Sequence, residues 1–214
     1  MRVIAIDGPA ASGKSSVSRR LAKRLGFAYV NSGSMYRAIT WEVLRQGVDT
    51  GSAADVADAL SNSEIASGIG GDGESFLRIN GTIPDAELRD IRVNQHVSLV
   101  SALPAVRDLV SARLRAVAGD RDVVMEGRDI GSAVFPETPF KFYLDASPEI
   151  RRKRRAAEGQ TDEIEARDKM DSTRKAAPLM IAGDARVIDT SHLTLDGVVE
   201  AVLDLLRPLG IAPQ

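Results

Sequence analysis

A glycine-rich segment near the start of the chain has the residue types and spacing of a phosphate-binding loop. Residues 8–15 match the pattern G-x-x-x-x-G-K-S in full, after an apolar run and before a helical pattern. In such a loop backbone N–H groups surround phosphate oxygens, and glycines permit the required dihedral angles. Lys14 would reach the β- and γ-phosphates of ATP, and the Ser15 hydroxyl would bind Mg²⁺. The residues expected to bind the nucleotide here are Gly8, Pro9, Ala10, Ala11, Ser12, Gly13, Lys14, Ser15 and Ser16.

A second polar segment, residues 31–37, could bind the molecule that accepts a phosphoryl group. It reads Asn-Ser-Gly-Ser-Met-Tyr-Arg, and the Arg37 guanidinium can hold a phosphate in a forked arrangement. Ser32 and Tyr36 add hydroxyl groups. The ordinary alternative is a loop and helix start, capped by Ser32 or Ser34.

A third polar segment, residues 126–131, reads Glu-Gly-Arg-Asp-Ile-Gly and follows a strand-like run. Arg128 and Asp129 place a cation and a carboxylate in one tight loop. The alternative is a structural ion pair that holds the turn, because ion pairs also serve structure alone.

The elements that must position these segments alternate between strand and helix. This alternation predicts an α/β fold, with a parallel sheet covered by helices. Because ligands of such sheets bind beyond the carboxyl ends of the strands, the three segments are expected around one cleft. The predicted strands are Val3–Ile6, Phe27–Val30, Asp122–Met125, Phe140–Leu144 and Val187–Ile188. The predicted helices are Ser15–Leu25, Ser34–Arg45, one that begins at Pro104, one opened by Ser147 with Pro148 in its first turn, and Asp196–Leu206.

The region from Gly68 to Gly81 interrupts this alternation. Residues 75–79 alternate in polarity and precede Asn80-Gly81, a pair typical of hairpin turns. The pattern predicts a small inserted hairpin.

Composition excludes several classes of function. The 214 residues contain no cysteine and two histidines, so thiolate catalysis, disulfides, cysteine-ligated zinc and multi-histidine metal sites are excluded. A net charge of −2 argues against nucleic-acid binding. No apolar run reaches the roughly 18 residues of a membrane span, and the N-terminal run is too short for a signal peptide. We therefore expect no nucleic-acid or membrane partner, and a cytoplasmic location.

The most basic stretch, Arg151–Arg155, occupies all angles of a predicted helix. Such a run is usually a solvated helix face, and the negative net charge disfavours the alternative of a nucleic-acid patch. Arg151 could instead border the adenine of ATP, since guanidinium planes stack on bases.

Taken in order, the motifs resemble those of bacterial cytidylate kinases over nearly the whole chain. The segments that carry the resemblance are Gly8–Ser15, Asn31–Arg37, Val93–Ser98, Pro104–Arg107, Glu126–Gly131, Val134–Pro136, Phe142–Ala146, Arg167-Asp168, Asp171–Arg174 and Ala177–Leu179.

The resemblance implies a fold, a reaction and a domain organisation. The fold would be a P-loop three-layer α/β/α domain with a parallel five-stranded sheet over residues 1–214, and the chain would be a monomer. It would carry a monophosphate-binding insert at about residues 67–100 and a lid at about 154–168. The implied reaction is ATP + (d)CMP to ADP + (d)CDP with Mg²⁺. Only residues 156–166 separate Arg155 from Arg167, so the lid is shorter than in many relatives.

The resemblance also implies roles for single residues. Arg37 and Arg128 would hold the acceptor phosphate, and Tyr36 would lie on the acceptor side. Asp171 and Arg174 would reach the ribose. The expected surroundings of cytosine are Ser32, Ser98, Arg107 and Asp129, and the expected catalytic residues are Lys14, Arg128, Arg167 and Arg174.

Two other functions fit the phosphate-binding loop. One is a kinase for another small molecule. Ser98, Arg107 and Asp129 argue against it, but they do so only through the resemblance to cytidylate kinases. The other is a nucleotide switch or a nucleic-acid-stimulated ATPase. A guanine-reading Asn-Lys-x-Asp element is missing, which disfavours a GTPase switch.

Overall fold

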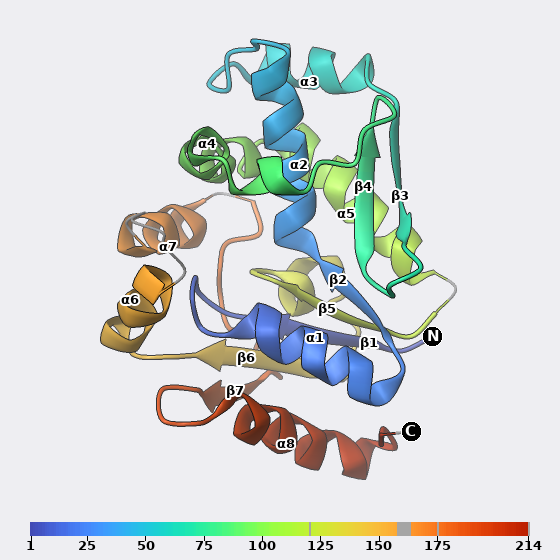
Figure 1. The fold of residues 1–214 in the computed structure, drawn as a ribbon, viewed down its shortest axis with the longest axis vertical. Helices are drawn as coiled ribbons and strands as arrows, with labels where there is room; N and C mark the ends of the chain where they lie inside the picture. Colours follow the sequence, from blue (N-terminus) through green and yellow to red (C-terminus); the bar gives the residue numbers. More distant parts are fainter. Residues whose placement is uncertain (120, 158–163, 175, 214) are drawn as a thin grey trace. The chain divides into compact units, whose positions relative to one another are not determined.

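The computed structural model describes residues 1–119, 121–157, 164–174 and 176–213, without the side chains of Ile164, Glu165 and Arg167. The chain divides into two compact units (Figure 1). The first unit comprises Met1–Val30 and Asp120–Gln214, and the second comprises Asn31–Gly119. The predicted insert lies within the second unit. The predicted lid includes residues 158–163, which lie outside the described part of the chain.

A five-stranded sheet forms the centre of the first unit, with the strand order β2-β5-β1-β6-β7. Strand β1 pairs in parallel with β5 and β6, and β6 pairs in parallel with β7. The predicted α/β class and parallel sheet are therefore confirmed. The strands are β1 (Val3–Asp7), β2 (Ala28–Asn31), β5 (Val123–Gly127), β6 (Lys141–Asp145) and β7 (Arg186–Asp189).

The predicted helices of the first unit begin within one residue of the expected positions, whereas α7 (Ile164–Thr173) was not predicted. Ser147 caps α6 as expected, since its Oγ accepts a hydrogen bond from the Ile150 N–H at 3.3 Å. The helices are α1 (Lys14–Leu25), α6 (Pro148–Ala157), α7 (Ile164–Thr173) and α8 (Leu195–Leu206), with a π-helical turn at Ile130–Val134 and a 3₁₀ turn at Arg207–Leu209. No helix in the described ranges is both long and apolar enough to cross a membrane.

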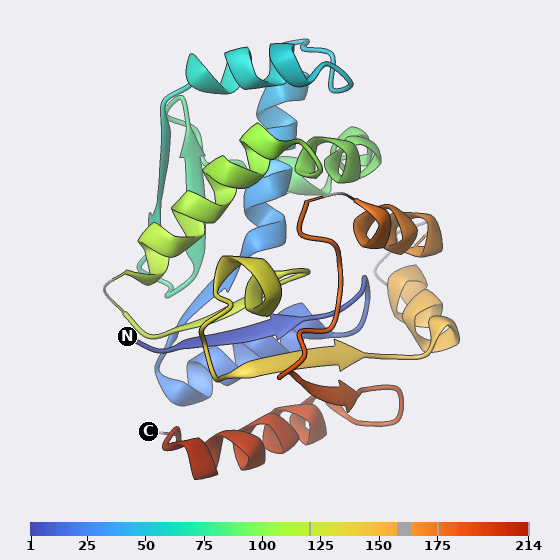
Figure 2. The same ribbon diagram turned by 180° about the vertical axis from the view of Figure 1, so that it is seen from behind.

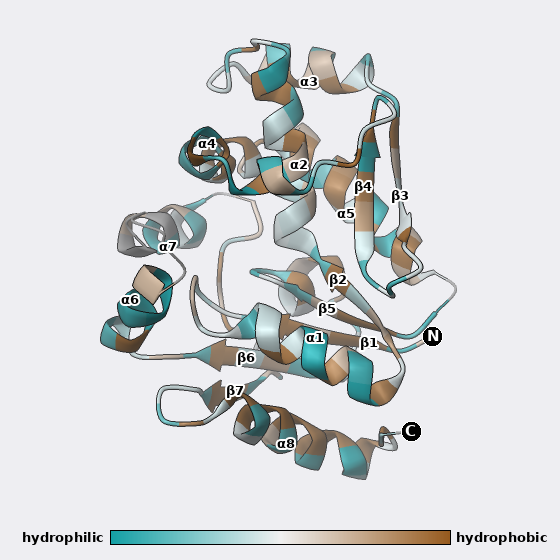
Figure 3. Cartoon of the chain, in the orientation of Figure 1, coloured by the Kyte–Doolittle hydropathy of each residue, from teal (hydrophilic) through white to brown (hydrophobic). Residues whose placement is uncertain are grey.

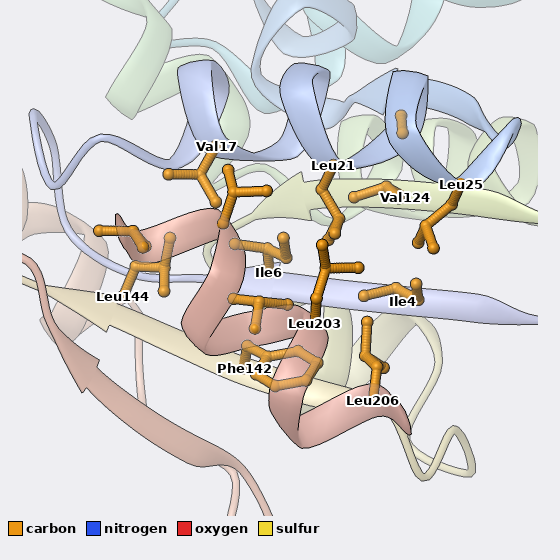
Figure 4. Close-up of a cluster of buried hydrophobic side chains, with 14 of the residues drawn as sticks. Ile4, Ile6, Val17, Leu21, Leu25, Val124, Phe142, Leu144, Leu203 and Leu206 are labelled. Atoms are coloured by element: carbon orange, nitrogen blue, oxygen red, sulfur yellow. The ribbon is translucent and has the colours of Figure 1, made fainter. Parts of the chain in front are cut away.

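The core of the first unit lies where α1 and α8 pack on the sheet (Figure 4). Val17, Leu21 and Leu25 are spaced four residues apart, so they share one face of α1, and all three are buried. They meet Ile4 and Ile6 of β1. Helix α8 carries both apolar and polar positions (Figure 3), and its apolar residues enter the same core. This packing supports the strand and the helix on either side of the glycine-rich loop.

The second unit consists of helices and a two-stranded hairpin, seen from behind in Figure 2. Its elements are α2 (Ser32–Arg45), α3 (Ala53–Ser61), β3 (Ile65–Ile69), β4 (Ser75–Ile79), the 3₁₀ turn Ala86–Arg89, α4 (Ile91–Ser101) and α5 (Pro104–Ala118). Pro104 begins α5 as predicted. Helix α2 begins two residues earlier than predicted, and its cap is Asn31 rather than Ser32 or Ser34, because the Asn31 side chain accepts from the Ser34 N–H at 3.0 Å.

The hairpin exists, but its main turn is not the predicted one. Strand β4 pairs antiparallel with β3, which precedes it, through the glycine-rich segment at residues 70–74. Asn80 and Gly81 do form a tight turn, with φ of 49° and 81°, but it closes only the single bridge between Ile79 and Thr82. The prediction failed because local turn chemistry identifies a turn and not the length of strand pairing beyond it.

Candidate active site

The glycine-rich loop connects β1 to α1, and its backbone requires glycine at two positions. Gly8 has φ of 150°, and a Cβ there would lie 2.1 Å from the Leu144 carbonyl oxygen. Gly13 has φ of 93° and precedes the first residue of α1. Because a side chain is strongly disfavoured at both positions, this path of the backbone depends on the glycines of the motif.

Lys14 is buried at the start of α1. Its Nζ donates to the Pro9 carbonyl oxygen at 2.5 Å and lies 3.4 Å from the Ser12 Oγ. Burial and, to a smaller extent, the positive charge of Arg128 lower the pKa of Lys14 to about 7, against the opposing effect of Glu126, Asp168 and Asp7. A phosphate anion beside Lys14 would restore its charged form.

Ser15 belongs to a chain of hydrogen bonds that sequence reasoning did not assign to the site. Its Oγ donates to Glu126 Oε2 at 3.0 Å, and the Tyr29 hydroxyl donates to Glu126 Oε1. Glu126 is buried near the end of β5, beside Ile6 of β1. The sequence did contain a sign of this role, because Glu126 begins the Glu-Gly-Arg-Asp segment at the end of the strand that lies beside β1. Ser16, like Ser15, lies exposed in the first turn of α1.

Asp7 holds the turn that directly follows Arg128 and Asp129. Its two carboxylate oxygens accept the backbone N–H groups of Ile130 and Gly131 at 2.8 and 2.7 Å. Burial raises the pKa of Asp7 to about 6, although these two hydrogen bonds oppose the rise. The carboxylate that ends β1 therefore orders the start of the π-helical turn.

Four of the predicted site residues form one buried charged cluster in the first unit. Arg128 Nε donates to Asp171 Oδ2 at 3.1 Å. The NH2 of Arg174 lies 3.3 Å from Asp129 Oδ1, and its NH1 lies 3.8 Å from Asp171 Oδ1. The Arg174 Nε donates to the Ala177 carbonyl oxygen at 2.6 Å. The side chains are at most 18% exposed, so their charges interact with little screening by solvent. Segments more than 40 residues apart in the sequence thus meet in one place.

The other predicted acceptor residues lie in the second unit, on α2, α4 and α5. Arg37 donates to the Leu88 carbonyl at 3.2 Å and to the Asn94 side chain. The Arg107 guanidinium lies 5.6 Å from the centre of the Tyr36 ring and donates to the Ser101 carbonyl at 3.3 Å. Ser32 is buried in the first turn of α2, and Ser98 is partly buried on α4. The structure therefore brings Tyr36 and Arg107 together.

Arg151 contacts the glycine-rich loop directly. Its NH1 donates to the Ala10 carbonyl at 3.1 Å and pairs with Asp168 of α7. The Asp168 carboxylate in turn accepts the Ala10 N–H at 3.0 Å. Asp168 was not predicted as a site residue. The side chain of Arg167, which was predicted, lies outside the described part of the structure.

Comparison with known proteins assigns the chain to a family. The family model described as cytidylate kinase matches residues 4–208. The chain belongs to the cytidylate kinase family. Curated cytidylate kinases of Nocardia farcinica and Mycobacterium leprae are 45% and 42% identical to it, over 92% and 96% of this chain and 90% and 95% of their own. The cytidylate kinase of Caldanaerobacter subterraneus subsp. tengcongensis is 41% identical over 95% of this chain and 94% of its own.

The residues around Ser15 suit the divalent cation that a cytidylate kinase would use. The Ser15 hydroxyl and the Glu126 carboxylate offer hard oxygen atoms, which Mg²⁺ prefers. Among the described residues there is no group of three or more acidic or histidine side chains that could hold a metal on its own. A cation here would therefore depend on nucleotide phosphates and water for its other ligands.

Proposed function

We propose that the chain transfers the γ-phosphoryl group of ATP to CMP or dCMP, giving ADP and CDP or dCDP. The observation that carries this proposal is the match to curated cytidylate kinases over more than nine tenths of the chain. The glycine-rich loop, with Lys14 buried at its end, supports the use of a nucleoside triphosphate as donor.

On the donor side, the loop amides and Lys14 hold the phosphates, and Ser15 contributes an oxygen to Mg²⁺. When bound there, Mg²⁺ would supply positive charge to the phosphate oxygens. The acceptor is a phosphate oxygen that is already anionic, so no general base is needed. Positioning and charge stabilisation supply the rate enhancement.

The acceptor roles are carried by separate groups of residues. In the first unit, Arg128 binds the acceptor phosphate, Asp171 and Arg174 reach the ribose, and Arg167 and Arg174 stabilise the transferring group. Asp129 accepts from the cytosine amino group, and this carboxylate disfavours uracil, which has an acceptor at that position. In the second unit, Arg37 binds phosphate, and Ser32, Tyr36, Ser98 and Arg107 surround the nucleoside.

We also propose that the enzyme acts as a cytoplasmic monomer, with an acceptor-binding insert at about residues 67–100 and a short lid at about 154–168. The absence of cysteine is compatible with a reducing compartment.

The proposed function is tested by coupled ADP release with Mg·ATP and each of CMP, dCMP, UMP, AMP and GMP. We expect fast turnover with CMP and dCMP and weak turnover with the other three. Turnover with none of the five would move the acceptor to another class of molecule. The roles of Asp129 and Arg107 would then be withdrawn.

ATP binding should take up protons at mildly alkaline pH. Burial lowers the pKa of Lys14 to about 7 and bound phosphates should raise it, so above pH 7 the complex should hold a proton that the protein without ATP has lost. The affinity for ATP should therefore fall as the pH rises above 7, by at most about tenfold per pH unit. Calorimetry at pH 8 in buffers of different ionisation enthalpy measures the uptake.

Lys14→Met provides the control for this measurement, because it keeps the length of the side chain and removes the titrating group. Binding of ATP to Lys14→Met should show no proton uptake by residue 14. Equal proton uptake in the wild type and the variant would contradict the assignment to Lys14.

A further inference from the structure

A carboxylate of the protein itself binds the glycine-rich loop. Asp168 of α7 accepts a hydrogen bond from the Ala10 N–H at 3.0 Å, and its side chain is 14% exposed. Ala10 lies within the Gly8–Ser15 motif, whose backbone N–H groups bind anions. One of the loop's backbone donors therefore has a carboxylate of the chain itself as its partner.

The same carboxylate also engages a buried cation. Arg151 of α6 pairs with Asp168 through NH1, which donates as well to the Ala10 carbonyl at 3.1 Å. The Arg151 side chain is only 10% exposed, and its buried Nε has no hydrogen-bond partner among the described residues. Asp168 thus lies between two groups, a loop amide and a guanidinium, that both suit a phosphate oxygen.

Carboxylate and phosphate oxygens accept the same hydrogen bonds, so one can replace the other at these donors. We propose that Asp168 is an internal competitor of the donor nucleotide, occupying the Ala10 amide and Arg151 until a phosphate of ATP displaces it. This inference rests on the proposed function, in which the loop binds ATP. Asp168 is then a residue that sets the affinity for the donor without taking part in the chemistry.

Two consequences follow for the affinity of the donor. The protein with Asp168 on the loop cannot offer its full set of donors, so the apparent affinity is reduced by the fraction in that state. The negative charge of Asp168 beside the loop also repels the incoming triphosphate. Removing the charge should therefore tighten ATP binding, which is the opposite of what loss of a ligand-binding residue would do.

The test is isothermal titration of Mg·ATP into the wild type, Asp168→Asn and Asp168→Ala, without acceptor. Both variants should bind ATP about tenfold more tightly, as expected for loss of a charge-assisted hydrogen bond that competes with the ligand. Asp204→Asn is the matched control, because Asp204 is an exposed carboxylate of the same unit that pairs with Arg207. Its affinity should stay within about twofold of the wild type.

Unchanged or weaker ATP binding in both Asp168 variants would overturn the proposal. Equal tightening in Asp204→Asn would also overturn it, because the effect would then come from net charge alone. Failure of the wild type to bind ATP would instead overturn the proposed function.

A measurement on the wild type avoids any effect of substitution on folding. In isotopically labelled protein, the through-hydrogen-bond coupling between the Ala10 amide nitrogen and the Asp168 carboxyl carbon should be present without nucleotide and lost with ATP. A coupling that persists in the ATP complex, or that is absent from the empty protein, would contradict displacement.

Discussion

Replacing Lys14 by alanine should abolish phosphoryl transfer to CMP and dCMP alike. Lys14 supplies the buried positive charge at the end of the glycine-rich loop, where its Nζ is held by the Pro9 carbonyl at 2.5 Å. Preorganised charges of this kind stabilise the transition state, and loss of one costs about 10²–10³ in kcat or more. We expect a loss of at least about 10³, because the same group also positions the donor phosphates. The coupled ADP-release assay measures it with both acceptors.

Lys23→Ala is the matched control, since Lys23 lies on the same helix and is exposed. Its turnover should match that of the wild type. The thermal midpoint of Lys14→Ala should not fall markedly, because burial disfavours the charged amine in the folded protein. Near-wild-type turnover in a folded Lys14→Ala would overturn the assignment of the loop.

Replacing Arg128 by alanine should damage use of the acceptor far more than binding of ATP. The Arg128 guanidinium is 18% exposed and is oriented by Asp171 at 3.1 Å, so it offers an ordered cation for a phosphate. We expect kcat/KM for CMP to fall by about 10²–10³, while the dissociation constant for ATP changes by less than about threefold. Steady-state kinetics with CMP and calorimetry with ATP separate the two effects.

Two further variants define the role of Arg128. Arg128→Lys keeps the positive charge but loses the planar guanidinium with its paired N–H donors. Its activity should therefore lie between those of Arg128→Ala and the wild type. Arg152→Ala removes an exposed arginine of α6 and should leave both constants unchanged. An equal loss of ATP binding and acceptor turnover in Arg128→Ala would show that the residue supports the fold rather than the acceptor.

The charged cluster around Arg128 is compatible with both a structural and a binding role. Arg128 pairs with Asp171 and Asp129 pairs with Arg174, so both acidic residues neutralise partly buried arginines. An arginine that already has a carboxylate partner can still bind a phosphate, since its planar fork offers five donors. The structural and functional interpretations of this segment therefore coexist, and the Arg128 variants measure the second.

By itself, the sequence determined the elements whose signals are local. The G-x-x-x-x-G-K-S spacing predicted the loop between β1 and α1, because glycine and lysine act there through their own backbone and side chain. Val17, Leu21 and Leu25 are spaced four residues apart in the sequence, which places them on the buried face of α1. Alternation of strand and helix predicted the parallel sheet. Even the error at Asn80-Gly81 concerned the extent of pairing and not the existence of a turn.

Only the tertiary structure decided which distant charged groups meet. Glu126 reaches Ser15 because β5 lies beside β1, and Asp7 reaches the Ile130 and Gly131 amides across the same pair of strands. Asp168 reaches Ala10 from a helix 158 residues further along the chain. Charged residues are common on helices and strand ends, so their type and spacing do not reveal their partners. Burial then gives these contacts their strength, because charges interact more strongly away from water, and burial depends on packing that local sequence patterns leave open.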